Sequence, residues 1–352
     1  MSGSREPVRR VVLRAPNWLG DAVLALPAMA ALRASFADAA LTIAGPASVA
    51  ALFREDTGVR PEAVLVLPAS TPESVRALRD GAFDLGVLFP NSFRSAWVLR
   101  RAGVPQRWGR ARGARGWLLT RRSRTSGRQA IEHHADFYRS MVRGFDIACG
   151  DERPSLAPSG RSIATVTVLL ERAGVPADAP MVGVAPGAAY GQAKQWPPAR
   201  MAAVMARLVR DRNVTCSVVG AAHDRPAARE IESWLRKHAP DTQSRVFDFT
   251  GRTDLGGLVG LASVCRVFVS NDSGAMHVAA ALGRPVVAIF GSTDERVTRP
   301  LGPVDVLTAD VFCRPCHLRD CPIDHRCMKR IDVDTVFDAV SRHLDARTDV
   351  AP

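Results

Sequence analysis

The chain has 352 residues, of which 47% are hydrophobic and 23% are charged, so a buried core is possible and wholesale disorder is excluded. A length above the roughly 250 to 300 residues at which single cores divide predicts two domains. Lys and Arg number 47 against 35 Asp and Glu, a net charge of +12, which predicts an anionic partner.

The apolar runs of the sequence are too short to cross a bilayer. The longest, Ala22 to Leu32 and Leu255 to Cys265, fall short of the roughly 18 residues that a spanning helix needs. The apolar residues that follow Arg9 and Arg10 are also too few for a secretory signal. We therefore expect a cytoplasmic protein whose seven cysteines are reduced thiols rather than disulfides.

The first half alternates short apolar, β-branched runs with helical patterns, which is typical of a parallel sheet. The clearest helix is Ala22 to Phe36, and Pro27 within it predicts a kink or a restart. We predict strands at Arg10 to Ala15, Leu41 to Ala44, Ala63 to Leu67 and Leu85 to Phe89.

A stretch rich in Pro, Ser and Gly, Asp151 to Arg161, interrupts this alternation and predicts a linker. The pattern then resumes, with strands predicted at Met181 to Pro186, Thr215 to Val219, Val246 to Phe249, Arg266 to Ser270 and Val286 to Phe290. Helices are predicted at Pro198 to Arg210, Arg225 to Lys237, Leu255 to Ala262, Gly274 to Leu282 and Val333 to His343. The sequence therefore predicts two doubly wound α/β domains, residues 1–160 and 161–352, facing each other across a ligand-binding cleft.

Polar residues follow three predicted strands of the second half. The turn from Asp272 through Ser273 and Gly274 opens the helix that carries His277, and a helix N-terminus attracts phosphate. The alternative is an ordinary helix cap formed by Asp272 or Ser273. Gly220 and Asp224 follow another predicted strand, Thr215 to Val219, and the Asp224 carboxylate suits ribose hydroxyls or, alternatively, a helix cap.

The segment Pro186 to Pro197 follows another predicted strand and contains Gly187, Gly191 and Lys194. Lys194 suits a diphosphate as a point charge, and the alternative is a solvated loop lysine. The segment lacks the Gly-Lys-Ser/Thr of a P-loop, and no Gly-x-Gly-x-x-Gly opens a helix in the chain, which disfavours ATP hydrolysis and dinucleotide redox chemistry.

In the first half, Asn17-Trp-Leu-Gly20-Asp21 follows the opening strand. A carboxylate at this strand end suits a general base that removes a proton from an attacking hydroxyl, and the alternative for Asp21 is an N-cap.

The segment from Arg94 to Arg128 contains eleven arginines and no Asp or Glu, interleaved with Trp97, Trp108 and Trp117. Such a segment suits phosphate groups or an anionic membrane leaflet. No nucleic-acid motif accompanies it, and a solvated basic loop is the alternative for about half of these arginines.

Late in the chain, four cysteines form a C-x2-C-x4-C-x5-C pattern. The opening pair is typical of a structural zinc site, whereas the later spacings are not, and thiols also pack as small buried groups. We predict no metal, and keep a structural site as the less favoured alternative for Cys313, Cys316, Cys321 and Cys327.

These motifs together resemble the ADP-heptose:lipopolysaccharide heptosyltransferases of glycosyltransferase family nine. The resemblance rests on Asn17 to Asp21, Lys194-Gln-Trp-Pro197, Ser270 to His277 and the cysteine pattern, so it extends over nearly the whole chain. The cysteines followed by Met328 are most similar to the heptosyltransferase II branch, which adds the second heptose of the inner core.

The resemblance implies a GT-B architecture of two Rossmann-like domains, with the acceptor bound by residues 1–160 and the donor by residues 161–352. It implies inverting transfer from ADP-heptose without a required cofactor, with Asp21 as the base and Lys194 at the leaving diphosphate. The donor residues it indicates are Gly187, Lys194, Gly220, Asp224, Asp272, Ser273, Gly274 and His277. The acceptor residues it indicates are Asn17, Gly20, Arg121 and Arg122.

The partners implied are an ADP-sugar donor, an anionic lipid-linked core oligosaccharide and the cytoplasmic face of the inner membrane, where the protein is peripheral, with no nucleic acid. A GT-B-like sugar-nucleotide epimerase is the alternative enzyme, although the arginine-rich segment argues against it. A non-catalytic nucleic-acid-binding protein is the alternative from another class.

Overall fold

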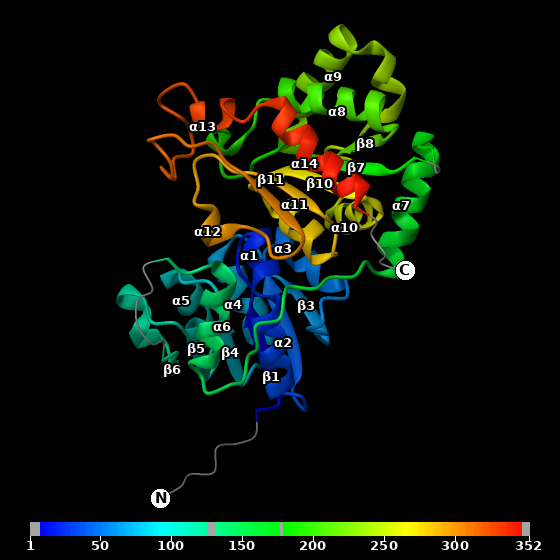
Figure 1. The fold of residues 1–352 in the computed structure, drawn as a ribbon. Helices are drawn as coiled ribbons and strands as arrows, with labels where there is room; N and C mark the ends of the chain where they lie inside the picture. The colour runs from blue at the N-terminus through cyan, green and yellow to red at the C-terminus, as the bar shows by residue number, and fades with distance from the viewer. Residues whose placement is uncertain (1–7, 125–130, 177–178, 347–352) are drawn as a thin grey trace, which may run out of the picture. The chain divides into compact units, whose positions relative to one another are not determined.

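The computed structural model describes residues 8–124, 131–176 and 179–346 (Figure 1). The chain divides into two compact units, Met1–Leu156 and Ala157–Pro352, and the division falls inside the stretch 151–161 predicted as a linker. Within the described residues, each unit contains one six-stranded sheet in which all pairings are parallel.

The sheet of the first unit has the order β3-β2-β1-β4-β5-β6. This corresponds to the 3-2-1-4-5-6 order of a doubly wound Rossmann sheet. The four predicted strands are confirmed, and two short polar strands at one edge, β5 and β6, escaped prediction because they lack β-branched runs. The strands are β1 (Arg10–Arg14), β2 (Ala40–Gly45), β3 (Ala63–Val66), β4 (Leu85–Leu88), β5 (Gln106–Gly109) and β6 (Arg121–Arg122).

The predicted helix after β1 is divided into α1 (Leu19–Leu24) and α2 (Leu26–Ser35), with Pro27 in the first turn of α2, as its fixed φ favours. The predicted restart is therefore confirmed. One face of the sheet packs on α4 (Thr71–Asp80) and α5 (Phe93–Arg101). The other elements of this unit are α3 (Ala47–Ala50), η1 (Ala51–Arg54), η2 (Gly113–Leu118) and α6 (His134–Arg143), which packs on α1 and α2.

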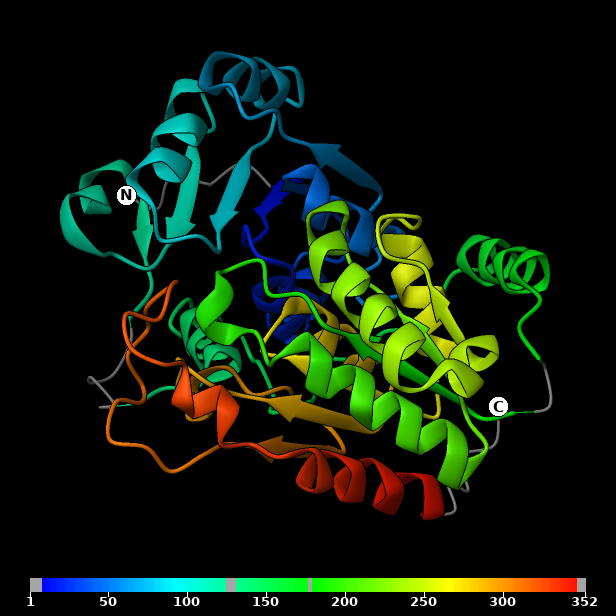
Figure 2. The ribbon, with the colours of Figure 1, turned by 90° about the horizontal axis from the view of Figure 1, so that it is seen from above.

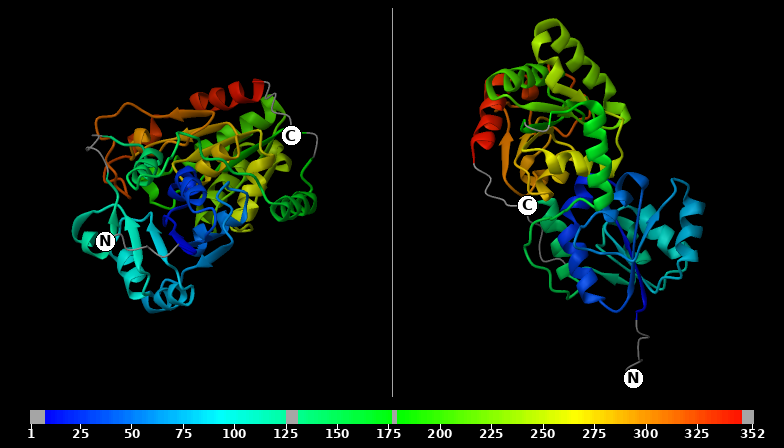
Figure 3. Two further views of the ribbon diagram at one scale, coloured as in Figure 1. Left: turned by 90° about the horizontal axis from the view of Figure 1, so that it is seen from below. Right: turned by 90° about the vertical axis from the view of Figure 1, so that its right-hand side faces the viewer.

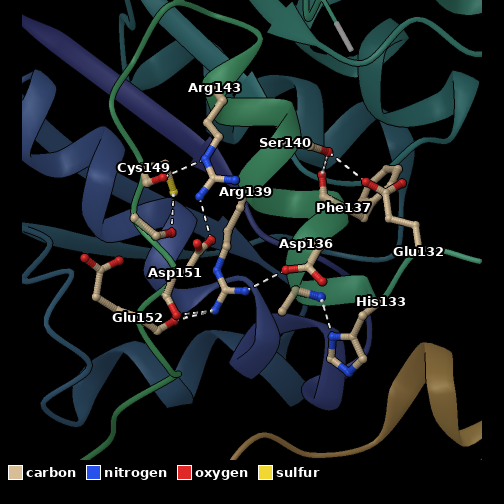
Figure 4. Close-up of polar contacts among 12 residues, drawn as sticks. Glu132, His133, Asp136, Phe137, Arg139, Ser140, Arg143, Cys149, Asp151 and Glu152 are labelled. Atoms are coloured by element: carbon tan, nitrogen blue, oxygen red, sulfur yellow. Dashed lines mark hydrogen bonds and ion pairs between the residues drawn. The ribbon is translucent and has the colours of Figure 1, made fainter. Parts of the chain in front are cut away.

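Two arginines of α6 hold the chain segment that leaves the first unit (Figure 4). Buried Arg139 donates to the carbonyl oxygens of Asp151 and Glu152 and pairs with Asp136. Arg143 donates to the carbonyl of Cys149 at 2.7 Å and to the Asp151 carboxylate at 2.6 Å, and this bond lowers the pKa of Asp151. These bonds satisfy the carbonyl groups of a segment that has no sheet or helix partners of its own.

The second sheet has the order β12-β11-β10-β7-β8-β9, which is the same doubly wound order. The five predicted strands are confirmed, and the edge strand β12 escaped prediction because its four residues include Asp305. The strands are β7 (Met181–Ala185), β8 (Thr215–Val218), β9 (Val246–Asp248), β10 (Val267–Asn271), β11 (Val286–Ile289) and β12 (Val304–Leu307).

Alternate strand residues of the second sheet enter two cores, one on each face. Val267 and Val269 of β10 pack on one face and Phe268 packs on the other, as the period of two requires. The first face is covered by α8 (Pro198–Arg212), α9 (Arg225–His238) and α14 (Val333–Asp345), and Figure 2 shows α14 alongside α8. The opposite face, visible in Figure 3, is covered by α7 (Gly160–Ala173), α10 (Leu255–Val264) and α11 (Gly274–Ala281).

The five helices predicted in this unit are confirmed. The last residues of the predicted linker are instead helical, because the Ser159 side chain accepts the backbone N–H of Ser162 and caps α7. The short elements are α12 (Glu295–Thr298), α13 (Arg326–Lys329), η3 (Gln192–Lys194), η4 (Ala222–Asp224) and η5 (Pro240–Arg245). Among the described residues, no helix combines the length and the apolar character that crossing a membrane requires.

Gly183 of β7 leaves room for the side chains of Phe268 on the neighbouring strand β10 and of Cys265 at the end of α10. A Cβ at this position would lie 2.4 Å from the Phe268 ring and 2.9 Å from the Cys265 sulfur, so we expect Gly183→Ala to lower the free energy of unfolding by about 1–3 kcal/mol. Gly160→Ala is the matched control, because nothing lies within 4 Å of its added Cβ, and it should be neutral or stabilising by up to about 1 kcal/mol. Urea denaturation of both variants tests this, and equal effects would contradict it.

Candidate functional site

A buried ion pair lies at the carboxyl edge of the second sheet. The Nζ atom of Lys194 is 2.6 Å from Oδ2 of Asp272, and the two side chains are only 11% and 5% exposed. Thr293, which follows β11, donates its hydroxyl to the same carboxylate oxygen at 2.6 Å. Lys194 is therefore not a solvated loop lysine, and that alternative is wrong.

Asn271, the last residue of β10, fixes the loop that carries Lys194. Its side-chain amide donates to the Pro186 carbonyl at 2.7 Å and accepts the backbone N–H of Trp196 at 3.0 Å. The Trp196 indole, fully buried, donates to the carbonyl of Ile331. The loop after β7 is thus held at Pro186 and at Trp196, and these buried hydrogen bonds fix the position of the Lys194 ammonium group between them.

The cysteine-containing segment packs against the outer side of this loop. The backbone N–H of Ala193 donates to the carbonyl of Arg319 at 2.8 Å, and the Tyr190 hydroxyl donates to the carbonyl of His317 at 2.8 Å. His325 Nε2 lies 3.1 Å from the carbonyl oxygen of Ala193. The segment therefore supports the Lys194 loop.

The four thiols of this segment differ in exposure. Cys327 is buried and Cys316 is exposed, while Cys313 and Cys321 are half-buried. Burial raises the pKa of the Cys327 thiol, and the neighbouring thiols raise it further. In the part of the chain that the structure describes, no three His, Cys, Asp or Glu side chains are grouped so that they could hold a metal ion.

Two glycines predicted at the donor site lie against Asp224. A Cβ on Gly187 would lie 2.1 Å from one Asp224 carboxylate oxygen, and a Cβ on Gly220 would lie 2.9 Å from the other. The carboxylate accepts the backbone N–H of Ala221 at 2.9 Å and makes no capping bond to α9. This bond makes Asp224 the capping-box acceptor at the start of η4, so the helix-cap alternative is confirmed for η4 and wrong only for α9. The three predicted residues lie together.

The turn before α11 leaves the helix without a side-chain cap. Ser273 occupies the N-cap position but makes no capping bond, and its hydroxyl lies 3.0 Å from the hydroxyl of Ser270. Asp272 is bound by Lys194, Gly274 begins the helix, and His277 is buried within it. The capping alternative is wrong here as well, so the dipole of α11 can favour a negative charge at this turn.

In the first unit, Asp21 lies in the first turn of α1 and is not its N-cap, which is Trp18. The capping alternative is wrong for this residue too. Its Oδ1 atom lies 2.8 Å from Nδ1 of His134, at the start of α6. The two side chains line a cavity of about 430 Å³ together with Asn17, Arg112, Glu132, Tyr138 and other residues of this unit.

His134 was missed in the sequence because 113 positions separate it from Asp21 and no local pattern connects them. The only signal is the pair His133-His134 at a helix start, which also suits capping, and His133 does cap α6. The pKa of Tyr138 in the same cavity is raised well above its usual value, first by burial and then by the charge of Asp21.

A second cavity of the first unit, about 580 Å³, contains Arg14 and Arg94. Burial, followed by the charge of Arg94, lowers the pKa of Arg14 to about 10. Arg14 also donates to the side-chain oxygen of Asn17 at 2.6 Å. Arg14 was not predicted as a site residue, since it is the last residue of a strand and its neighbour Arg94 is distant in sequence.

Of the remaining acceptor residues, Gly20 lies in α1 beside Asp21, whereas the two arginines lie elsewhere. Arg121 pairs with Asp146 at 2.7 Å, and exposed Arg122 donates to the carbonyl of Gly116. Neither lines the cavity of Asp21. Arg128, the last residue of the basic segment, lies outside the described residues.

The buried pair predicts strongly coupled variants. Asp272→Asn leaves the Lys194 ammonium without its counter-charge, so we expect unfolding to become easier by about 3–5 kcal/mol, and Lys194→Met should cost a similar amount. The double variant should cost less than the sum, as measured by a double-mutant cycle in urea. Asp211→Asn, which breaks the exposed pair with Arg207, is the control and should cost less than about 1 kcal/mol. Additive costs at Lys194 and Asp272 would contradict the coupling.

Comparison with known proteins places this arrangement in a family. The model of glycosyltransferase family 9 (heptosyltransferase) matches residues 73–326. Lipopolysaccharide heptosyltransferase 2 of Escherichia coli K12 is 29% identical over 302 residues, covering 83% of this chain and 85% of the relative.

Two solved structures have the same fold as this chain over most of its length. The structure of E. coli ADP-heptose LPS heptosyltransferase II has a TM-score of 0.80 and 26% identity, covering 95% of this chain and 98% of that one. A family 9 glycosyltransferase from Veillonella parvula has the same fold, with a TM-score of 0.79 at 18% identity and coverage of 96% and 97%. The chain is a glycosyltransferase and belongs to glycosyltransferase family 9, the heptosyltransferase family.

Proposed function

We propose that this protein transfers L-glycero-D-manno-heptose from ADP-heptose to the first heptose of the lipopolysaccharide inner core, as heptosyltransferase II does. The relatives at 24% to 29% identity are all named heptosyltransferase 2, which supports this branch of the family. The observation that carries the proposal is the buried Lys194–Asp272 pair beside the uncapped N-terminus of α11, because this site suits a nucleotide diphosphate.

The donor binds to residues 161–352 in this proposal. The strand order reverses between β7 and β10, where doubly wound sheets bind nucleotides. The diphosphate lies at Ser273 and Gly274, with Lys194 as the point charge and His277 behind the turn. The ribose hydroxyls donate to Asp224. Gly187 and Gly220 leave the space around this carboxylate free, since a side chain at either position would collide with it.

The acceptor binds to residues 1–160. Asn17 and Gly20 lie beside Asp21, and half-buried Arg14 with exposed Arg94 suits an acceptor phosphate. Exposed Arg122 is a further acceptor contact, whereas Arg121 must first release Asp146.

Transfer is a single displacement with inversion. Asp21 accepts the proton of the acceptor hydroxyl as that oxygen bonds to the anomeric carbon of the heptose. The bond from this carbon to the diphosphate oxygen breaks, and ADP leaves with the electron pair. Lys194 and the α11 dipole stabilise the charge that develops on the diphosphate, without a required cofactor. His134 orients the Asp21 carboxylate through its Nδ1 contact.

In this proposal the enzyme acts in the cytoplasm, at the inner face of the inner membrane, where its lipid-linked acceptor is made. The two alternatives have less support. An epimerase needs no lipid-linked acceptor and would leave the Asp21 cavity and the arginines of the first unit without a role. A nucleic-acid-binding protein would need neither the buried lysine nor the Asp21–His134 contact.

Transfer from ADP-heptose to a heptosyl-Kdo2 lipid acceptor tests the proposal. Asp21→Asn should lower turnover by about 10² to 10⁴, because the amide cannot accept the proton, while ADP binding stays near that of the wild type. Asp80→Asn, which neutralises an exposed carboxylate on α4, is the control and should be fully active. A folded wild type that binds ADP but transfers no heptose would overturn the donor or acceptor assignment, and an active Asp21→Asn enzyme would overturn the base.

A further inference from the structure

Three large aromatic side chains form an exposed cluster on the first unit. Phe93 and Trp97 of α5 and Trp117 of η2 are 47%, 36% and 53% exposed. Their ring centroids lie 6.2 Å apart for Phe93 and Trp97, 6.2 Å for Phe93 and Trp117, and 6.5 Å for the two tryptophans. Together the rings present one continuous apolar surface to solvent, which is costly unless something covers it.

Arginines border this aromatic cluster. The Arg100 guanidinium lies 4.8 Å from the centroid of the Trp117 ring, and that of Arg101 lies 5.9 Å from the centroid of Trp97. Both are exposed, and neither forms an ion pair with a carboxylate within the described ranges. Their charges are therefore available to an anion that approaches the rings.

The cluster is held rigidly from behind. Arg115, two residues before Trp117, is 1% exposed and donates to the carbonyl oxygens of Pro90 and Ser92, which precede α5. Arg107 donates to the carbonyl of Leu118 at 2.7 Å. The bonds of Arg115 join η2 to the start of α5, and the bond of Arg107 joins η2 to β5. The aromatic rings are therefore exposed because the fold holds them there, and not because they lie on a flexible loop.

We propose that Phe93, Trp97 and Trp117, with Arg100 and Arg101, are the surface by which this protein docks on an anionic phospholipid bilayer. Tryptophan and phenylalanine rings favour the interfacial region of a bilayer, and arginines at the same depth pair with phosphate groups. The inference deepens the peripheral membrane location proposed above by naming the surface. It does not depend on which sugar is transferred.

Charge and geometry together favour a bilayer over the other occupants. A second copy of the chain would bring the unpaired arginines of both copies together, which is unfavourable. Single-stranded nucleic acid stacks its bases on separated ring faces, whereas these rings contact one another and offer a shared surface. An anionic bilayer satisfies both components, because its phosphates meet the arginines and its interface accepts the rings.

Flotation with vesicles tests the surface. The wild type should bind vesicles of phosphatidylglycerol and phosphatidylethanolamine, and binding to phosphatidylcholine alone should be at least about tenfold weaker. Trp97→Ala/Trp117→Ala and Arg100→Gln/Arg101→Gln should each lower the partition coefficient on anionic vesicles by about tenfold or more. Circular dichroism and ADP binding report on the fold of each variant, independently of the heptose-transfer assay.

The chain offers matched controls for both changes. Ile163→Ala/Val264→Ala removes apolar side chains that are 50% and 49% exposed in the second unit. Arg172→Gln/Arg229→Gln removes the same amount of charge from exposed positions of α7 and α9. Each control should retain wild-type vesicle binding within about twofold, since it leaves the aromatic cluster intact.

Quenching by brominated acyl chains gives a second, direct measurement. Tryptophan fluorescence of the wild type should be quenched by brominated phosphatidylglycerol vesicles, and Trp97→Phe/Trp117→Phe should abolish most of that quenching while retaining binding. Absence of wild-type binding to anionic vesicles would overturn the inference, as would equal loss in the charge control. A dimer seen by light scattering that Trp97→Ala/Trp117→Ala dissociates would assign the surface to a second copy instead.

Discussion

The ion pair between Lys194 and Asp272 is the interaction on which the second unit depends most directly. Two charges that are almost fully buried cost several kcal/mol each in lost hydration, and their attraction offsets this only if the geometry is close and the remaining acceptor sites are used. Thr293 supplies the additional bond to the carboxylate. The pair therefore joins the loop after β7 to the ends of β10 and β11, and a displacement of any of these would leave a charge without compensation.

Such a pair is stable only because the backbone around it is held by other bonds. Asn271 and Trp196 hold the loop from the strand side, and the segment around His317 and Arg319 holds it from outside. An ammonium group positioned in advance need not reorganise when negative charge develops nearby, and this preorganisation is where electrostatic catalysis obtains most of its effect. The cysteine-containing segment thus acts through the loop it supports, whether or not its thiols have further chemistry.

The fold was largely predictable, because its buried strands are short, mainly apolar runs that contain β-branched residues, and such runs can be recognised without knowledge of their partners. The strands that escaped prediction, β5, β6 and β12, are edge or near-edge strands that contain charged residues, and their assignment comes from pairing with a neighbour. The composition of 151–161, rich in Pro, Ser and Gly, predicts a linker up to Arg161, whereas the capping bond of Ser159 starts α7 at Gly160. In each case tertiary or capping bonds outweighed the local propensity.

The site was predictable only in part, for the same reason. Strand-end positions identified Asp21, Lys194, Asp224 and Asp272, since the carboxyl ends of parallel strands meet at one edge of a sheet. What these residues bind inside the protein was not predictable: His134 reaches Asp21 from α6, and Lys194 reaches Asp272 across 78 positions.

Asp21 of the first unit and Lys194 of the second are held in different ways, and the difference suits the roles proposed for them. Lys194 is buried and paired with Asp272, so the position of its ammonium group is fixed, as the proposed stabilisation of a leaving group requires. Asp21 is 24% exposed in its side chain and contacts an imidazole that is itself 39% exposed, in a cavity open to a ligand. A general base must exchange its proton with solvent after each turnover, and a carboxylate as deeply buried as Asp272 would do so slowly. The two units have the same strand order, yet the first leaves the Asp21 carboxylate accessible to solvent and the second buries the Asp272 carboxylate.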